Sequence, residues 1–306
     1  MKNVFKQFYE NCYLKTQGFI PVKPLDQYLF PGDFFQIKNG NIVLLGNVFE
    51  GGVIDSEEVS FSEGLKLNEA SWFFSKDVSK VYSGREVGEA ELEEVFTFSK
   101  QILAFKGLGS FYFKAQHPEL IKIENWNQMY QELIIKLTQT MYSFREVYVV
   151  TEVVTAENWT LAVGGAKNAE LEIVTKNKNF GLVDIFGNSN SQTVQARNIE
   201  YYHEETTRKP SFFKAKKLVV RPQHLDTFIS ELLLKQKGRF DWVQQFYTYD
   251  FNCEAVDFSA RIPYNVNESV LDMLQSNQLN PNTALLYFDW VDASLDDVEK
   301  LFNEVK

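Results

Sequence analysis

Apolar residues recur every three or four positions in six stretches of the chain, which is the spacing of one buried helix face. The first stretch is followed by Gly18 as a stop signal, and the last begins with a capping signal from Ser294 to Asp297. The pattern predicts helices over residues 4–12, 92–103, 126–141, 222–237, 268–274 and 295–305.

Other stretches are rich in β-branched and aromatic residues and are bounded by Gly, Pro or Asn, as strands are. Asn39 and Gly40 tolerate the positive φ of a tight turn, so residues 34–38 and 42–46 are expected to form a hairpin. The other predicted strands cover residues 53–61, 65–76, 111–115, 146–163, 169–176, 181–187, 191–205 and 211–221, with a strand pair within 240–262.

The composition is that of a chain that folds. Of its 306 residues, 44% are hydrophobic and 24% charged, which is enough for one large domain or two small ones. A net charge of −10 argues against nonspecific nucleic-acid binding over the whole surface. Charges interrupt residues 1–18, and no stretch approaches the ~20 apolar residues of a membrane-spanning helix. We therefore expect a cytoplasmic protein.

No motif in the sequence predicts an enzyme. The three histidines, His117, His203 and His224, lack the spacing of a metal pair, and two cysteines are too few for a disulfide framework. A nucleophile elbow and a phosphate loop are both absent from the sequence. Carboxylates are abundant, but abundant acidic residues usually form a solvated face. The sequence thus predicts no catalytic residue, no metal and no cofactor.

Charge is unevenly distributed near the end of the β-rich region. Between Thr206 and Pro222 every charged residue is basic, and aromatic residues lie among them. This combination is typical of a surface for anionic lipid or nucleic acid, and equally of a strand end with one solvated face. The candidate lipid-contact residues are Arg208, Lys209, Lys214, Lys216, Lys217 and Arg221.

The chain end has the opposite sign. Six carboxylates and two lysines lie between Asp289 and Lys306. Such a segment can cover a basic surface, with Val298, Leu301 and Phe302 as its docking stripe; the alternative is an ordinary terminal helix.

Cys12 also has two interpretations, because a cysteine on an apolar helix face is a candidate for thioester acylation and also a common core residue.

Several short segments occur in an order that matches a known family. They are Gly18-Phe19-Ile20-Pro21-Val22, Pro31-Gly32-Asp33, Val43-Leu44-Leu45-Gly46, Phe111-Tyr112-Phe113, Tyr148-Val149-Val150-Thr151-Glu152-Val153-Val154 and Phe212-Phe213-Lys214-Ala215. In this order they resemble bacterial gasdermins, and the segment from Tyr148 to Val154 is also similar to animal gasdermin pore-forming domains. The resemblance covers roughly Gly18 to Val220.

The resemblance implies an α+β fold with a twisted, mostly antiparallel central sheet and surrounding helices, like a gasdermin N-terminal domain. Strand 147–154 should be central, with helices 126–141 and 222–237 packed on the sheet. Residues 1–222 would form the pore-forming region. Residues 223–306 would form a C-terminal extension, longer than the tail typical of bacterial members, that contains an inhibitory segment and packs in the same globular unit.

The implied function is that of an autoinhibited pore-forming protein, not an enzyme. A protease removes the inhibitory segment, and the remainder oligomerises in a membrane and causes lytic cell death, as in antiphage defence. Its partners would be the protease, anionic or bacterial inner-membrane lipid and further copies of itself, and not nucleic acid. The chain would move from the cytoplasm to the inner membrane after cleavage, and Cys12 is the candidate for a palmitoyl group.

Two regions, 53–80 and 157–205, have the ~9 to 11 residues per strand that a spanning hairpin needs. Their candidate membrane residues are Phe61, Leu65, Leu67, Trp72, Phe73, Leu161, Val163, Leu171, Ile173, Leu182, Ile185 and Phe186. Residues 277–293 are the expected protease-accessible connection, and a cut there should leave the tail weakly held because one short helix buries little. The alternative function is a non-membrane α+β module that binds a partner protein.

Overall fold

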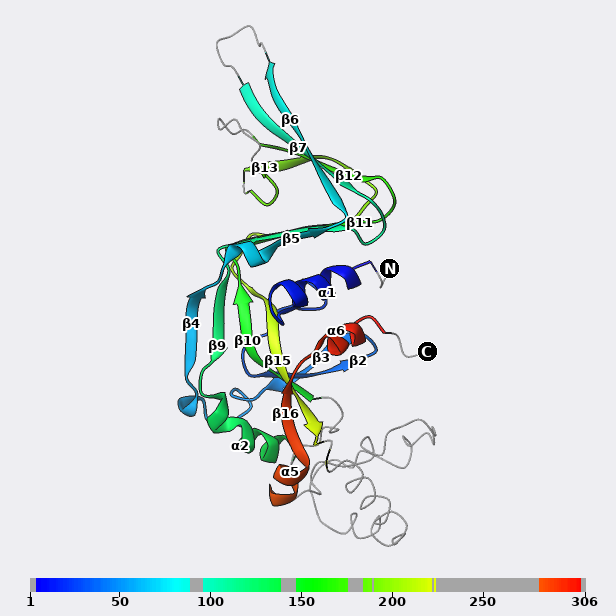
Figure 1. Ribbon diagram of the computed structural model, residues 1–306. Coiled ribbons are helices and arrows are strands. Elements are labelled where there is room, and N and C mark those ends of the chain that lie inside the picture. The colour runs from blue at the N-terminus through cyan, green and yellow to red at the C-terminus, as the bar shows by residue number, and fades with distance from the viewer. Residues whose placement is uncertain are drawn as a thin grey trace, which may run out of the picture.

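Strands dominate the fold, and they pair antiparallel in three sheets (Figure 1). The computed structural model describes residues 4–88, 96–138, 147–175, 184–188, 190–221, 223 and 281–303. Every pairing between described strands is antiparallel, and short helices lie around the sheets. The predicted α+β fold class is confirmed.

The largest sheet, here called the central sheet, has eight strands. Its main path runs β1 (Ile20–Pro21), β15 (Pro210–Val220), β10 (Val147–Thr155), β2 (Asp33–Lys38) and β3 (Asn41–Asn47). Three more strands attach to it: β9 (Glu119–Ile123) to β10, β4 (Phe61–Lys66) to β9, and β16 (Phe288–Asp292) to β15. All residues of β10 except Glu152 are buried, so the predicted central position of this strand is confirmed.

Two four-stranded sheets continue the molecule away from the central sheet. The middle sheet has the order β14 (Ile199–Glu205), β11 (Asn158–Gly164), β8 (Phe111–Gln116) and β5 (Phe73–Lys76). The projecting sheet, at the top of Figure 1, has the order β13 (Ser191–Arg197), β12 (Ala169–Thr175), β7 (Phe96–Phe105) and β6 (Val78–Gly88).

Helices cover the central sheet and close its core. They are α1 (Lys6–Lys15), α2 (Trp126–Thr138), α5 (Pro281–Tyr287) and α6 (Leu295–Lys300), with 3-10 turns at η1 (Ser56–Glu58) and η2 (Glu69–Trp72). Helix α1 buries Phe8 and Cys12, as its apolar spacing predicts, and also Tyr9. Helix α2 buries Leu133 and Ile134. None of the described helices combines the length and the hydropathy required to cross a bilayer.

The predicted helix over residues 92–103 is wrong, because β7 occupies Phe96–Phe105 and pairs with both β6 and β12. Its apolar residues fit a helix period in part, but Leu103 and Phe105 alternate with outward residues and are buried by non-local strands. Short apolar runs are ambiguous between the two periods, and pairing decides between them.

Other predicted boundaries also change. Residues 146–163 form two strands in different sheets, β10 and β11, and residues 191–205 form β13 and β14, separated by Asn198 at φ +54°. Residues 53–60 and 67–72 hold the 3-10 turns instead of strands, because Asp55 and Asn68 accept hydrogen bonds from backbone N–H groups two residues ahead. Residues 184–187 form no strand, and α6 ends at Lys300. The elements predicted at 222–237, 240–262 and 268–274 lie outside the described residues.

Candidate functional site

The described C-terminal residues 281–303, here called the cover, lie against the central sheet. Strand β16 adds to the edge of β15, with Lys216 opposite Asp292 and Lys217 opposite Val291. Figure 1 shows β16 and α6 in orange and red beside β15, with α6 close to α1. A segment from the chain end therefore completes the sheet that the middle of the chain builds.

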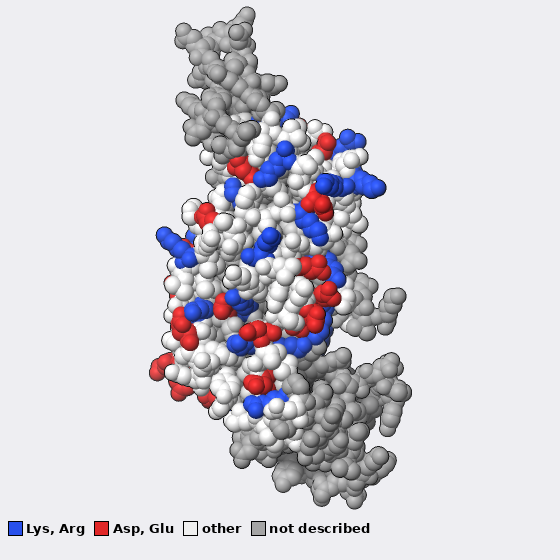
Figure 2. Space-filling view, viewed as in Figure 1, with Lys and Arg blue, Asp and Glu red and all other residues white. Residues whose placement is uncertain are grey.

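Charges of opposite sign face each other along this edge. Lys216 Nζ lies 2.6 Å from Asp292 Oδ1, Lys217 Nζ 3.0 Å from Asp297 Oδ1, and Arg221 Nε 3.7 Å from Asp289 Oδ2. Three predicted lipid-contact residues are thus paired with acidic residues of the cover. In Figure 2, basic and acidic side chains are interspersed over the visible face of the molecule, with no large basic area.

The other three basic candidates form ion pairs within the described residues before the cover, here called the body. Arg208 lies 2.8 Å from Glu119, Lys209 3.5 Å from Glu205, and Lys214 3.3 Å from Glu152. These partners do not belong to the cover. Of the six basic candidates, removal of the cover would therefore separate Lys216, Lys217 and Arg221 from their described carboxylate partners; it would also separate Lys6 of α1 from Glu299.

Asp297 is the most enclosed carboxylate of the cover. Its Oδ1 accepts hydrogen bonds from Tyr148 Oη at 2.7 Å and from Lys217 and Lys300, while Oδ2 accepts from the Ser294 N–H at 2.9 Å. Burial opposes its ionisation, but these hydrogen bonds and the Lys217 charge outweigh burial and hold the pKa of Asp297 well below its usual range. The carboxylate is therefore charged in the folded chain.

Apolar side chains of the cover complete the core on the α1 side of the sheet. Val298, Leu301 and Phe302, the predicted docking stripe, are 0%, 1% and 7% exposed. The Phe302 ring packs edge-on against Tyr9 of α1 with centroids 5.1 Å apart. The Lys23 ammonium donates to the carbonyl of Leu301 and lies 4.5 Å from the Phe302 ring centroid.

The N-terminal half of the cover packs on the opposite face. Tyr287, Phe288 and Trp290 are buried with α2, and Trp290 Nε1 donates to the carbonyl of Tyr130 at 3.1 Å. The predicted protease-accessible connection at 277–293 is therefore wrong for residues 281–293, which form α5 and β16; residues 277–280 lie outside the described part.

The projecting sheet holds the longest hairpin of the described chain, which the sequence pattern did not single out. Strands β6 and β7 have 11 and 10 residues and pair along their length. The hairpin candidates predicted from the sequence are spread more widely. Phe61 and Leu65 lie in β4 and Leu67 just after it, Trp72 in η2, Phe73 in β5, Leu161 and Val163 in β11, Leu171 and Ile173 in β12, and Ile185 and Phe186 in the loop after it; Leu182 is outside the described residues.

Asp184 joins the projecting sheet to the middle sheet. It accepts from Lys80 of β6 at 2.8 Å, from Gln101 of β7 at 3.1 Å and from the Tyr112 hydroxyl of β8. Burial opposes ionisation here too, yet the three donors lower the pKa of Asp184. Sequence reasoning missed this residue, because its partners are 72 to 104 positions away.

Cys12 lies in the core under α1 and is 0% exposed. Burial raises the pKa of its thiol far above the ordinary value, and a thiol in this state is a poor nucleophile. Its acylation stays a prediction.

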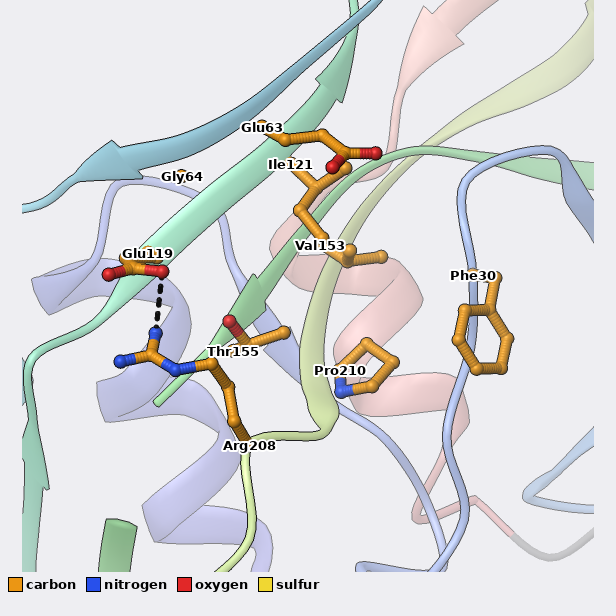
Figure 3. Close-up of a pocket in the computed structure, with 9 residues that line it drawn as sticks. All are labelled: Phe30, Glu63, Gly64, Glu119, Ile121, Val153, Thr155, Arg208 and Pro210. Atoms are coloured by element: carbon orange, nitrogen blue, oxygen red, sulfur yellow. Dashed lines mark ion pairs between the residues drawn. The ribbon is translucent and has the colours of Figure 1, made fainter. Parts of the chain in front are cut away.

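A groove beside β9 is a second candidate site. Figure 3 shows Phe30 and Pro210 on one side and the Arg208–Glu119 ion pair on the other. Its nine lining residues include no histidine, cysteine or lysine. Within the described ranges, no three metal-ligating side chains come together either. The polar side chains of the groove are the paired Arg208 and Glu119, together with Glu63 and Thr155.

Comparison with known proteins finds similarity among solved structures. No protein-family profile matches the chain, and no curated protein sequence matches it. Among solved structures, the chain is similar to a bacterial gasdermin from Bradyrhizobium tropiciagri, at 14% sequence identity and a TM-score of 0.33. The alignment covers 70% of this chain and 88% of that one.

Proposed function

We propose that this chain is a pore-forming protein held inactive by its C-terminal cover. A protease cuts between the body and the cover, the cover leaves, and the remaining chain oligomerises in an anionic membrane and lyses the cell, as in bacterial defence against phage. Before the cut the chain resides in the cytoplasm, and after it in the inner membrane. This proposal takes over, for this chain, the whole mechanism that the resemblance in segment order implies.

The observation that carries the proposal is the cover itself. Its strand occupies the β15 edge, its carboxylates pair with three basic residues of β15 and its end, and its apolar residues close the core. Loss of the cover would leave an open strand edge and a more basic surface, because residues 281–303 carry five carboxylates and one lysine. Open edges favour pairing with other chains, and basic surfaces favour anionic lipid.

The projecting sheet supports the membrane step. A spanning strand needs ~9 to 11 residues, and β6 and β7 already have 11 and 10. One face of the sheet, here called the apolar face, buries Leu103, Leu171 and Ile173 and also holds Lys80 and Gln101. On the other, here called the charged face, Lys100 lies 2.7 Å from Glu172 beside Ile102. The apolar cluster is the candidate lipid-facing side in a membrane barrel.

Vesicle leakage before and after a defined cut tests the proposal. A protease recognition sequence replaces residues 277–280, and the matched control carries the same residues in scrambled order. The cut chain should release a trapped dye from vesicles with anionic lipid, less from neutral vesicles and least at high salt. The uncut and scrambled chains should release little. Expression of residues 1–276 alone in bacteria should be toxic.

The alternative is a soluble module that binds a partner protein. If the cover is cut and separated from the body, and the body then stays soluble and releases no dye from any vesicle, the pore-forming proposal fails. That outcome would favour the interaction module.

A further inference from the structure

The central sheet has two edges that differ in how they are protected. The edge of β15 from Lys216 to Val220 is filled by β16. At the other end of the sheet, β3 pairs with β2 alone among the described strands. Natural edge strands usually carry a charge, a proline or a distortion that prevents pairing with another chain.

Strand β3 has little of this protection. Its sequence, Asn-Ile-Val-Leu-Leu-Gly-Asn, contains no charged residue and no proline, and Val43 and Leu44 are 37% and 54% exposed. An irregularity in its pairing lies between Leu44 and Gly46, so Asn41–Leu44 remains regular. Among the residues that the structure describes, Asn41–Leu44 of β3 is therefore an apolar edge with β2 as its one strand partner.

Strand direction makes the two edges complementary. β15 is antiparallel to β10, β10 to β2, and β2 to β3, so β3 runs opposite to β15. β16 also runs opposite to β15. In a second copy placed beside the first in the same orientation, β3 would therefore meet β15 in the direction that β16 has now.

The strand register also allows β3 of a second copy to take the place of β16. One row of paired residues crosses the whole sheet on one face: Val291, Lys217, Tyr148, Phe35 and Leu44. In an unshifted register, Leu44 of the next copy takes the place of Val291. Both side chains are about half exposed, so the exchange buries a similar apolar group beside Lys217.

The cover touches both edges. Its strand fills the β15 edge, while the Lys23 ammonium bonds both the carbonyl of Leu301 and, at 2.8 Å, the carbonyl of Gly40 in the β2–β3 turn. A side chain at Gly40 would meet the Leu301 carbonyl at 3.0 Å. Departure of the cover thus changes both edges at once.

We propose that β3 of one copy adds to the β15 edge of the next copy after the cover has left, so that the copies share one continuous antiparallel sheet. This inference rests on the proposed function for its trigger, and it names the surface through which copies join. The partner is a second copy of this chain, because the two open edges match in direction, register and face.

Two variants of Leu44 with opposite charges test this row of paired residues directly. Leu44→Lys places a cation next to Lys217 of the neighbour and should reduce oligomer yield and leakage rate of the cut chain at least tenfold. Leu44→Glu is the matched comparison, since it is also charged but faces Lys217 with the opposite sign, and it should retain at least severalfold more oligomer and leakage than Leu44→Lys. Leu44 is 54% exposed, so the resting fold should persist in both variants.

Cross-linking between two differently tagged populations locates the contact. One population carries Leu44→Cys and the other carries Lys217→Cys or, for a register shifted by two, Val219→Cys, all with Cys253→Ser. After the cut and addition of vesicles with anionic lipid, a disulfide should form between the populations in one of these same-face pairs. Leu44→Cys with Leu218→Cys is the control, because these side chains project from opposite faces.

The outcomes separate this inference from the proposed function. Cross-links in the same-face pair, seen after the cut and not before, support the inference. Leakage that is equal in the Lys and Glu variants, with no cross-link in either register, overturns it and leaves pore formation standing. Cross-links without leakage from any vesicle overturn the pore and leave the strand addition standing.

Discussion

Asp297 connects the cover to the central sheet through donors from three elements. Tyr148 belongs to β10, Lys217 to β15 and Lys300 to α6, and Ser294 caps the same helix. The residue fixes both the start of α6 and its position on the sheet. In the proposed function, Asp297 holds the cover on the sheet through the donors of Tyr148 and Lys217.

Asp297→Ala should destabilise the folded chain by roughly 3 kcal/mol, because removal of one partner of a buried ion pair leaves its polar neighbours in a dry site. Asp296→Ala is the control: it removes the same charge from the exposed first turn of α6 and should cost below ~1 kcal/mol. Urea denaturation of both variants measures the difference. Equal midpoints would show that the Asp297 contacts contribute little.

The lowered pKa values of Asp297 and Asp184 predict how stability depends on pH. Each group binds protons more weakly in the folded chain than in the unfolded chain. Their stabilisation is thus fully present above the ordinary carboxyl pKa of ~4 and is lost as pH falls below it. These two groups should leave the unfolding free energy unchanged from about pH 8 to 5 and should lower it below pH 4 by up to ~1.4 kcal/mol per pH unit for each group. Asp297→Asn should make the acid slope shallower, and an unchanged slope would contradict the assignment.

Cys12 should be unreactive in the resting chain. Its side chain is fully enclosed, and burial raises its thiol pKa, so a maleimide should not label it at neutral pH. In a Cys253→Ser background, labelling should become complete in denaturant. Any thioester found by mass spectrometry on chain from its native cell would then have formed before Cys12 was enclosed. Rapid labelling of the folded chain would disprove the enclosure.

At the level of elements, strands with a strict local signal could be predicted and those that depend on distant partners could not. The Asn39-Gly40 turn predicts the β2–β3 hairpin, and continuous Val and Thr predict β10. The β6–β7 hairpin was missed because Leu103 is buried by Leu171 and Phe186, which are distant in the sequence. The run of basic residues and the run of acidic residues indicated the two surfaces that meet where the cover docks. No pattern in the sequence indicated that Asp184 joins the projecting sheet to the middle sheet.

The two faces of the projecting sheet predict which side meets lipid. Ala196 of β13 pairs with Leu171 on the apolar face, and Gln195 pairs with Glu172 on the charged face; both are exposed in the resting chain. Ala196→Lys should therefore leave resting stability within ~0.5 kcal/mol but reduce leakage after the cut, since a lysine facing lipid costs about 2–4 kcal/mol at the midplane. Gln195→Lys, one residue away, should leak like the parent. Equal leakage rates would mean that this sheet does not enter the bilayer in this orientation.

On the scale of the whole molecule, the cover is larger than a terminal helix. The sequence led us to expect weak retention after a cut, on the premise that one short helix buries little. In the structure the cover buries six large side chains: Tyr287, Phe288, Trp290, Val298, Leu301 and Phe302. At about 1.5–3 kcal/mol for each, their burial contributes on the order of 10 kcal/mol before the cost of association.

The cut cover should therefore stay bound in solution and leave only at a membrane. After the cut at residues 277–280, body and cover should elute together in gel filtration at micromolar concentration, and no oligomer should form. Vesicles with anionic lipid should then separate them, because lipid headgroups replace Asp289, Asp292 and Asp297 as partners of the β15 cations. Flotation of the vesicles, with a separate tag on each piece, measures this: the body should float and the cover should remain below. Asp297→Ala should let the cut cover separate from the body without vesicles. Immediate loss of the cover from the parent chain after the cut would show that the cut alone, and not the membrane, releases it.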